Sequence, residues 1–425
     1  MDKSLSAKQK KTLIYVFLVA FLLRTIFIFS FHNYDDIKRL KIGGEEMIQI
    51  ATNIVKGYGF SGKFLFDKDT KPTAVMAPLY PYFLALFLKF FGMKGYLIVE
   101  LIQAIFSSFI CIIIYLTGLK LFNNERVALI ASILSVFYLP LIYYCTVIWS
   151  AIFFVFLITL YILNLLKYHP DQNQYNIFVL GLILGITLLT DPVIILFIPL
   201  SLLWFLLNLK TGFKTSLKNI ILILGLSLII VMPWTVRNYM VFNKFIFIKS
   251  TIGFNFWVGN NPYATGVLRL VNKDNTEYHI SEQDFNYLSS LDESTRDRFF
   301  ISSAITFIRE NPKEFIRLSL KKFSSFWWVI ENKNTGFNDN TKIKTMKGTY
   351  GIPFILALFG MILSYNQIKS CSLILFFLVS LSLTYSITMV AVYRFRFPVE
   401  PYLLLFAAVP ISKLSDKFLI KKKIR

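Results

Sequence analysis

Long apolar runs separated by short polar loops dominate this chain. Such runs are typical of membrane-spanning helices, because a helix needs roughly 20 apolar residues to cross the hydrocarbon core. We therefore predict an all-α polytopic membrane protein, a bundle of about ten transmembrane helices with amphipathic helices and a small domain outside the membrane. The predicted spans lie near residues 12–31, 97–119, 127–143, 146–166, 177–190, 192–209, 219–235, 351–366, 371–391 and 399–414.

Two longer polar segments interrupt the apolar pattern, at residues 32–96 and 236–350. They divide the chain into an N-terminal transmembrane module (1–235, with a first outer loop at 32–96), an outer loop domain (236–350) and a C-terminal transmembrane module (351–425). In the first loop, Pro78–Gly92 is short for a span and is expected to lie in or dip into the membrane interface.

Each polar segment also contains a predicted amphipathic helix. In the first, Met47, Ile50, Ala51 and Ile54 share one face, and Gly57 is a suitable terminator. In the second, Asn311-Pro312 is typical of a helix start. From there Ile316, Leu320, Phe323 and Trp327 form an apolar stripe, which indicates a helix resting on the membrane surface.

Composition and charge agree with a membrane protein. The 425 residues are 56% hydrophobic and 17% aromatic, which excludes a soluble globular domain. The net charge of +21 comes mainly from lysines in short loops and in both tails. Their distribution predicts a plasma-membrane protein with both termini in the cytoplasm and both polar segments outside. Membrane lipids, and not nucleic acid, are therefore the expected partners of this charge.

Cysteine and histidine give no sign of a disulfide or a metal site. The chain has three cysteines, all within apolar runs, and three histidines that are far apart. Neither set has the spacing of metal ligands. We predict no metal site built from them. The histidines are His32, His169 and His279, and the cysteines are Cys111, Cys145 and Cys371.

The acidic pair Glu45-Glu46 begins the first amphipathic helix, and we expect it on the outer side. Glu46 lies at the boundary between the polar and apolar faces, where partial burial would raise its pKa and suit it to proton abstraction. The alternative is that both acids only complement the positive end of the helix dipole. Geometry alone divides these two interpretations evenly.

Arginines near the outer ends of spans suggest a site for phosphate. Arg237, Arg394 and Arg396 have planar guanidinium groups that can bind oxyanions through two hydrogen bonds. Interfacial anchoring is the commoner role of such residues. Arg24 lies inside the first span, where a cation is costly, and we expect it to pair with Asp191. A structural ion pair and a contact with substrate are equally good interpretations of Arg24.

Several motifs together resemble the bacterial family 39-type glycosyltransferases of the GT-C superfamily, relatives of protein O-mannosyltransferases and the lipid A aminoarabinose transferase. No single motif is very specific, but their order and spacing are, and the resemblance runs from about residue 20 to 412. The motifs are Leu23-Arg24, Gly44-Glu45-Glu46, Gly57-Tyr58-Gly59-Phe60, Pro72-Thr73-Ala74, Ala77-Pro78-Leu79-Tyr80-Pro81, Pro233-Trp234-Thr235-Val236-Arg237-Asn238-Tyr239, Gly259-Asn260-Asn261-Pro262, Asn311-Pro312 and Arg394-Phe395-Arg396-Phe397-Pro398.

The resemblance implies an enzyme that moves a sugar from a polyprenyl-phosphate donor to an acceptor (lipid, glycan or protein) outside the cytoplasm. It implies an acidic base in the first outer loop, at Glu46 or Glu45, since many relatives have aspartate there. It implies no nucleotide cofactor and leaves a divalent metal open. The remaining candidate substrate-binding residues are Asp36, Tyr80, Asn238, Asn260, Asp191 and Arg24; for Asn260 a purely structural turn is favoured.

Two other functions fit the same residues. A transporter or flippase of a lipid-linked saccharide would use the arginines to hold phosphate while moving the lipid. Transporters are often built from internal repeats with broken helices at mid-membrane, and the sequence shows no repeat. An inactive scaffold in an envelope-assembly complex is a third interpretation, and the paired acids argue weakly against it.

Overall fold

The computed structural model describes residues 5–31, 44–64, 66–168, 175–208, 212–266, 280–328, 340–389 and 393–424. Within these ranges the fold is helical, as predicted. The one difference is a short antiparallel hairpin in the first loop, where β1 (Ser61–Gly62) pairs with β2 (Lys71–Pro72).

Every predicted span corresponds to an apolar helix or helix pair. Five helices are long and apolar enough to cross a membrane, and a bent pair, α6 with α7, makes a sixth. The other apolar helices are shorter, with 10–17 residues each. The bundle consists of α1 (Ala7–Phe31), α5 (Lys94–Phe122), α6 (Glu125–Phe137), α7 (Leu139–Tyr143), η1 (Tyr144–Thr146), α8 (Ala151–Lys167), α9 (Tyr175–Thr190), η2 (Pro192–Leu196), α10 (Phe197–Asn208), α11 (Phe213–Phe242), α16 (Asn340–Leu363), η4 (Tyr365–Gln367), α17 (Ile368–Thr388), η5 (Tyr393–Val399) and α18 (Glu400–Ile424).

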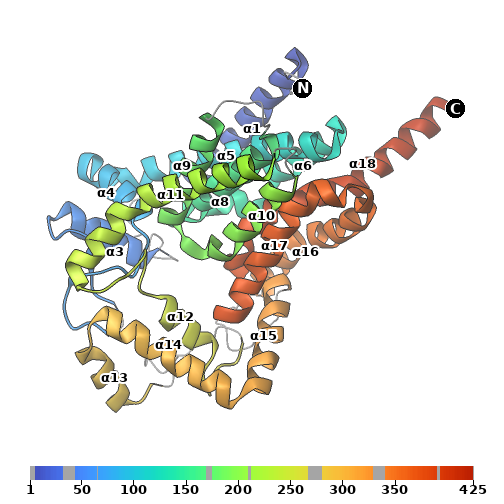
Figure 1. The fold of residues 1–425 in the computed structure, drawn as a ribbon. Coiled ribbons are helices and arrows are strands. Elements are labelled where there is room, and N and C mark those ends of the chain that lie inside the picture. The colour runs from blue at the N-terminus through green and yellow to red at the C-terminus, as the bar shows by residue number, and fades with distance from the viewer. Residues whose placement is uncertain are drawn as a thin grey trace.

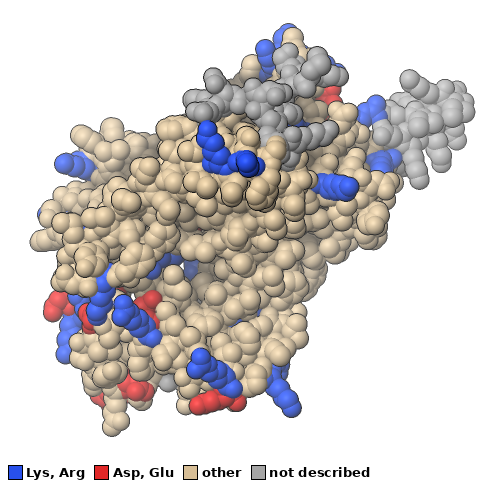
Figure 2. All heavy atoms as spheres, viewed as in Figure 1, with Lys and Arg blue, Asp and Glu red and all other residues tan. Residues whose placement is uncertain are grey.

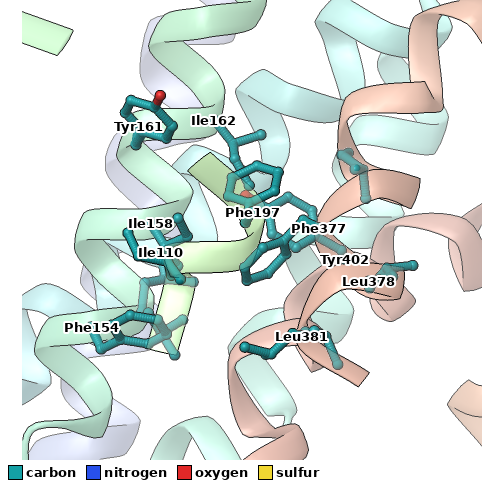
Figure 3. Packing of buried hydrophobic residues seen from close by; sticks show 14 of the residues in the cluster. Ile110, Phe154, Ile158, Tyr161, Ile162, Phe197, Phe377, Leu378, Leu381 and Tyr402 are labelled. Atoms are coloured by element: carbon teal, nitrogen blue, oxygen red, sulfur yellow. The ribbon is translucent and has the colours of Figure 1, made fainter. Parts of the chain in front are cut away.

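The core of the bundle lies where α5, α8, α10, α17 and α18 meet. Figure 3 shows Phe197 between the α8 residues Ile158 and Ile162 and the α17 residue Phe377. Phe197 and Phe377 meet edge to face at 5.1 Å between ring centroids. Because lipid is as apolar as these side chains, tight packing and buried polar contacts must hold the helices together.

The remaining elements form a second layer along one side of the bundle. We call this the loop layer, and Figure 1 shows it below and to the left of the apolar helices. The N-terminal end of α1 and the C-terminal end of α18 point away from α12–α15 in the same view. The loop layer consists of α3 (Glu45–Val55), the hairpin, α4 (Leu79–Phe91), α12 (Ile252–Gly259), α13 (Glu282–Ser290), α14 (Glu293–Glu310) and α15 (Pro312–Trp327).

A buried carboxylate ties the two parts of the loop layer together. Glu293, at the start of α14, accepts hydrogen bonds from the hydroxyl of Thr73 (2.7 Å), the backbone N–H of Ala74 (2.8 Å) and the hydroxyl of Ser250. Nearby, Arg296 donates to Asp67 at 2.8 Å. The first loop is therefore fixed against α14 by groups that are shielded from water.

The helix α15 has a polar group on its inner face. The predicted stripe Ile316, Leu320 and Phe323 is exposed, at 57%, 64% and 41%. Lys322 is fully buried instead, and it donates to the carbonyl oxygens of Gly259 and Ile387. Burial lowers the pKa of Lys322 to about 8. The two accepting carbonyls lie at the C-terminal ends of α12 and α17, and the negative ends of two helix dipoles stabilise a buried cation.

Candidate active site

The acids begin α3 as predicted. Glu45 and Glu46 occupy the first turn of the helix, and Met47, Ile50 and Ala51 are buried beneath them. Both carboxylate side chains are exposed, so the partial burial expected for Glu46 is not found. The amphipathic pattern fixed the face of the helix correctly, but it placed Glu46 too close to the apolar side.

The start of α3 is seated on a break in the membrane bundle. We call residues 144–150, which join α7 to α8, the break segment; its last four residues are not helical. Gly44 packs so closely on this segment that a Cβ atom there would lie 1.8 Å from the carbonyl oxygen of Ile148. Only glycine permits this approach, and the approach places Glu45 and Glu46 beside the break segment.

Arg394 reaches the same segment from the other side. Its guanidinium lies 5.5 Å from the ring centroid of Trp149 and 5.4 Å from that of Phe395. Its Nε atom is buried and has no hydrogen-bond partner within the described part of the chain. A guanidinium that lies over aromatic rings and has an unpaired donor can still donate to a ligand. Arg394 is therefore suited to bind an oxyanion.

The other two candidate arginines have internal partners, contrary to the expectation that they bind phosphate. Arg237 donates to the carbonyl oxygens of Thr73 (2.8 Å) and Phe60 (3.0 Å), so it holds the first loop. Arg396 is 2% exposed and forms an ion pair with Glu400 at 2.9 Å. Sequence alone cannot separate Arg394 from Arg396, because only their packing differs.

The expected pairing of Arg24 with Asp191 is wrong. Arg24 is fully buried and donates to Ser107 (2.7 Å) and to the carbonyl oxygens of Ser135 and Val136 (both 3.3 Å). Those two carbonyls lack their usual helical partners, because Pro140 removes one N–H and bends the chain between α6 and α7. The membrane arginine thus stabilises the bend that precedes the break segment.

Asp191 pairs with Lys249 instead, at 3.1 Å, and also accepts from the backbone N–H of Val193 at the start of η2. Both side chains of the pair are partly exposed, at 26% and 20%. The sequence gives no signal that singles out Lys249 among so many lysines.

The remaining candidates are mostly structural. Tyr80 is 1% exposed and donates to Gln103 at 2.8 Å. Asn238 donates to the carbonyl oxygens of Ile246 and Ile248, and Asn260 donates to that of Ile387. Asp36 lies outside the described residues. The structure thus places Gly44, directly before the acids, and Arg394 against neighbouring residues of the break segment.

A metal site is not apparent among the residues that the structure describes. No group of three His, Cys, Asp or Glu side chains there could hold an ion. The three histidines lie outside the described ranges. The three cysteines are buried and free, in agreement with the predicted lack of a disulfide.

Comparison with known proteins supports a common fold. Residues 71–236 match the family model described as dolichyl-phosphate-mannose-protein mannosyltransferase. Comparison with curated protein sequences found no match.

Among solved structures, this chain is similar to the apo oligosaccharyltransferase of Archaeoglobus fulgidus (TM-score 0.59, 13% identity, 97% of this chain and 51% of that one). It is also similar to the oligosaccharyltransferase AglB of that organism in complex with an inhibitory peptide and a dolichol-phosphate (TM-score 0.57, 13% identity, 99% and 52%). ArnT from Cupriavidus metallidurans bound to undecaprenyl phosphate matches with a TM-score of 0.47 (9% identity, 93% and 59%).

This chain spans about half the length of the oligosaccharyltransferases that it matches. The likeness nevertheless extends over nearly all of this chain, including both the apolar bundle and the loop layer. This chain therefore shares the fold of these oligosaccharyltransferases.

Proposed function

We propose that this protein transfers a sugar from a polyprenyl-phosphate donor to an acceptor at the loop layer. One observation carries the proposal: Gly44, directly before the acids, and Arg394 contact neighbouring residues of one break segment. Irregular backbone is tolerated at membrane depth only where protein covers it or where it lines a cavity. In this proposal, a carboxylate from one side of the break segment and a cation from the other act on the two ends of one reacting bond.

The proposed reaction is a single displacement with inversion. A nucleophilic group of the acceptor attacks the anomeric carbon and gives its proton to Glu46. The bond between that carbon and the phosphate oxygen breaks, and the polyprenyl phosphate leaves with the electron pair. Arg394 stabilises the charge that develops on the phosphate, a role suited to a preorganised cation. Glu45 is the alternative base.

The orientation follows from the lysines. We place the loop layer outside the cytoplasm and both termini within it, because short loops and tails rich in Lys and Arg stay inside. In Figure 2, the upper side of the bundle has mainly basic side chains, whereas the loop layer has both signs. The proposed donor enters from the bilayer, and no resident nucleotide cofactor is part of the proposal.

The test uses purified protein in proteoliposomes with radiolabelled polyprenyl-phosphate hexoses and pentoses. We expect sugar transfer to an envelope extract by the wild type and its loss in Glu46→Gln and Arg394→Gln, with all three proteins equally folded. Full transfer by Glu46→Gln would assign the base to another residue. Movement of intact donor across the bilayer without its consumption would establish a flippase and refute the enzyme.

A matching experiment identifies the product. Mass spectrometry of envelope glycolipids and glycoproteins from a deletion strain should show the loss of one sugar increment. Complementation with Glu46→Gln should leave that increment absent, whereas the wild-type gene should restore it.

A further inference from the structure

Trp149 lies between the two ends of the proposed site. It is half-buried and packs against two hydrophobic clusters, the main core of the bundle and a smaller cluster that contains Met47 and Ala51 of α3. On the other side, the guanidinium of Arg394 lies over its ring. Its neighbour Ile148 supports Gly44.

The backbone around Trp149 is held in place by side chains from the bundle. Gln103 donates to the carbonyl oxygens of Cys145 (2.9 Å) and Val147 (3.1 Å), and Tyr80 fixes the Gln103 amide. The backbone N–H of Trp149 donates to the carbonyl oxygen of Val147 at 2.8 Å. These contacts satisfy backbone groups that a helix would otherwise pair, so the indole is presented from a rigid support.

A membrane anchor is the common role of tryptophan, but it does not fit this position. Anchoring tryptophans face the lipid headgroups at the membrane surface. Trp149 instead lies between packed clusters inside the protein, and Tyr144 covers part of it at 5.9 Å between ring centroids. The rest of the Trp149 side chain is only partly covered.

We propose that Trp149 is the platform for the sugar ring of the donor, an inference that rests on the proposed function. A donor whose phosphate lies at Arg394 must place its sugar towards the acids. One face of a pyranose or furanose presents C–H groups, which pack well on an aromatic ring. The platform would leave the anomeric carbon open to the acceptor held near α3.

The test compares two lipids on each variant in nanodiscs: a polyprenyl-phosphate hexose and the sugar-free polyprenyl phosphate. The ratio of their dissociation constants isolates the contribution of the sugar. We expect Trp149→Leu to reduce the preference for the sugar-bearing lipid about tenfold or more, as truncation of a tryptophan anchor does. Trp149→Phe should retain part of it. Arg394→Gln should weaken both lipids and leave the ratio unchanged.

Trp328→Leu is the matched control, because Trp328 is a tryptophan that is 43% exposed but lies directly after α15. It should leave the ratio unchanged. An unchanged ratio in Trp149→Leu, or an equal loss in Trp328→Leu, would overturn the assignment even if transfer activity is found. If the wild type binds both lipids but transfers no sugar, the proposed enzyme fails, and the ratio still decides the role of Trp149.

Discussion

Replacing Arg396 by glutamine distinguishes a structural arginine from Arg394, two residues away, for which we propose a role in phosphate binding. Arg396 is paired with Glu400 at 2.9 Å and donates to the carbonyl oxygen of Phe326 at 3.0 Å. Its guanidinium lies 3.3 Å from the ring centroid of Tyr350. Since both partners of the ion pair are at most 4% exposed, the variant leaves a buried carboxylate without its cation.

Breaking a buried ion pair on one side costs about 3–5 kcal/mol. We expect Arg396→Gln to lower the free energy of unfolding in detergent by about that amount, measured by chemical denaturation. The double variant Arg396→Gln/Glu400→Gln should recover much of the loss, because the two amides can hydrogen-bond to each other. Arg394→Gln should change stability little and activity strongly. A stable but inactive Arg396→Gln would refute this division of roles.

The remaining predictions concern the support of the site. Gly44→Ala should destabilise the protein by about 1–3 kcal/mol in the denaturation assay and reduce transfer, since the new methyl group meets the backbone of Ile148. Gly212→Ala is the matched control and should leave stability unchanged, because a Cβ atom at Gly212 would meet nothing within 4 Å. Glu293→Gln should lower the free energy of unfolding by about 1–3 kcal/mol, because an amide cannot accept from every donor around Glu293. An unchanged denaturation midpoint would show that Glu293 does not hold the first loop against α14. Burial, aided by Glu293, raises the pKa of Asp297 to about 6. Between its ordinary pKa of 3.8 and about 6, the folded state binds the extra proton, so stability should fall as the pH rises through this window in the wild type, but not in Asp297→Asn.

The sequence predicted the fold well because lipid imposes a simple rule. Apolar runs identified the helices, and the spacing of Met47, Ile50 and Ala51 identified the buried face of α3. Glu45 and Glu46 were placed correctly at its first turn. These features depend on residues close in sequence, so composition and periodicity are enough to find them.

The partners of the charged groups could not be predicted in the same way. Arg24 contacts Ser135 and Val136, which are 111 and 112 residues away, and only Pro140 offered a signal that those carbonyls would be free. Arg237 was assigned to phosphate because a guanidinium group near the outer end of a span suits an oxyanion. Its internal acceptors are backbone oxygens, which every residue carries. Nothing in the local sequence distinguishes such an acceptor from an open site.

The same choice of acceptors has a consequence for how this protein can diversify. Arg237 grips the first loop through the carbonyl oxygens of Phe60 and Thr73, whose geometry survives most substitutions in the loop. Exposed side chains between those two anchor points can therefore change while Arg237 still holds the loop in place. A family of such proteins could adapt to new acceptors by altering this rim, with no need to rebuild the membrane scaffold beneath it.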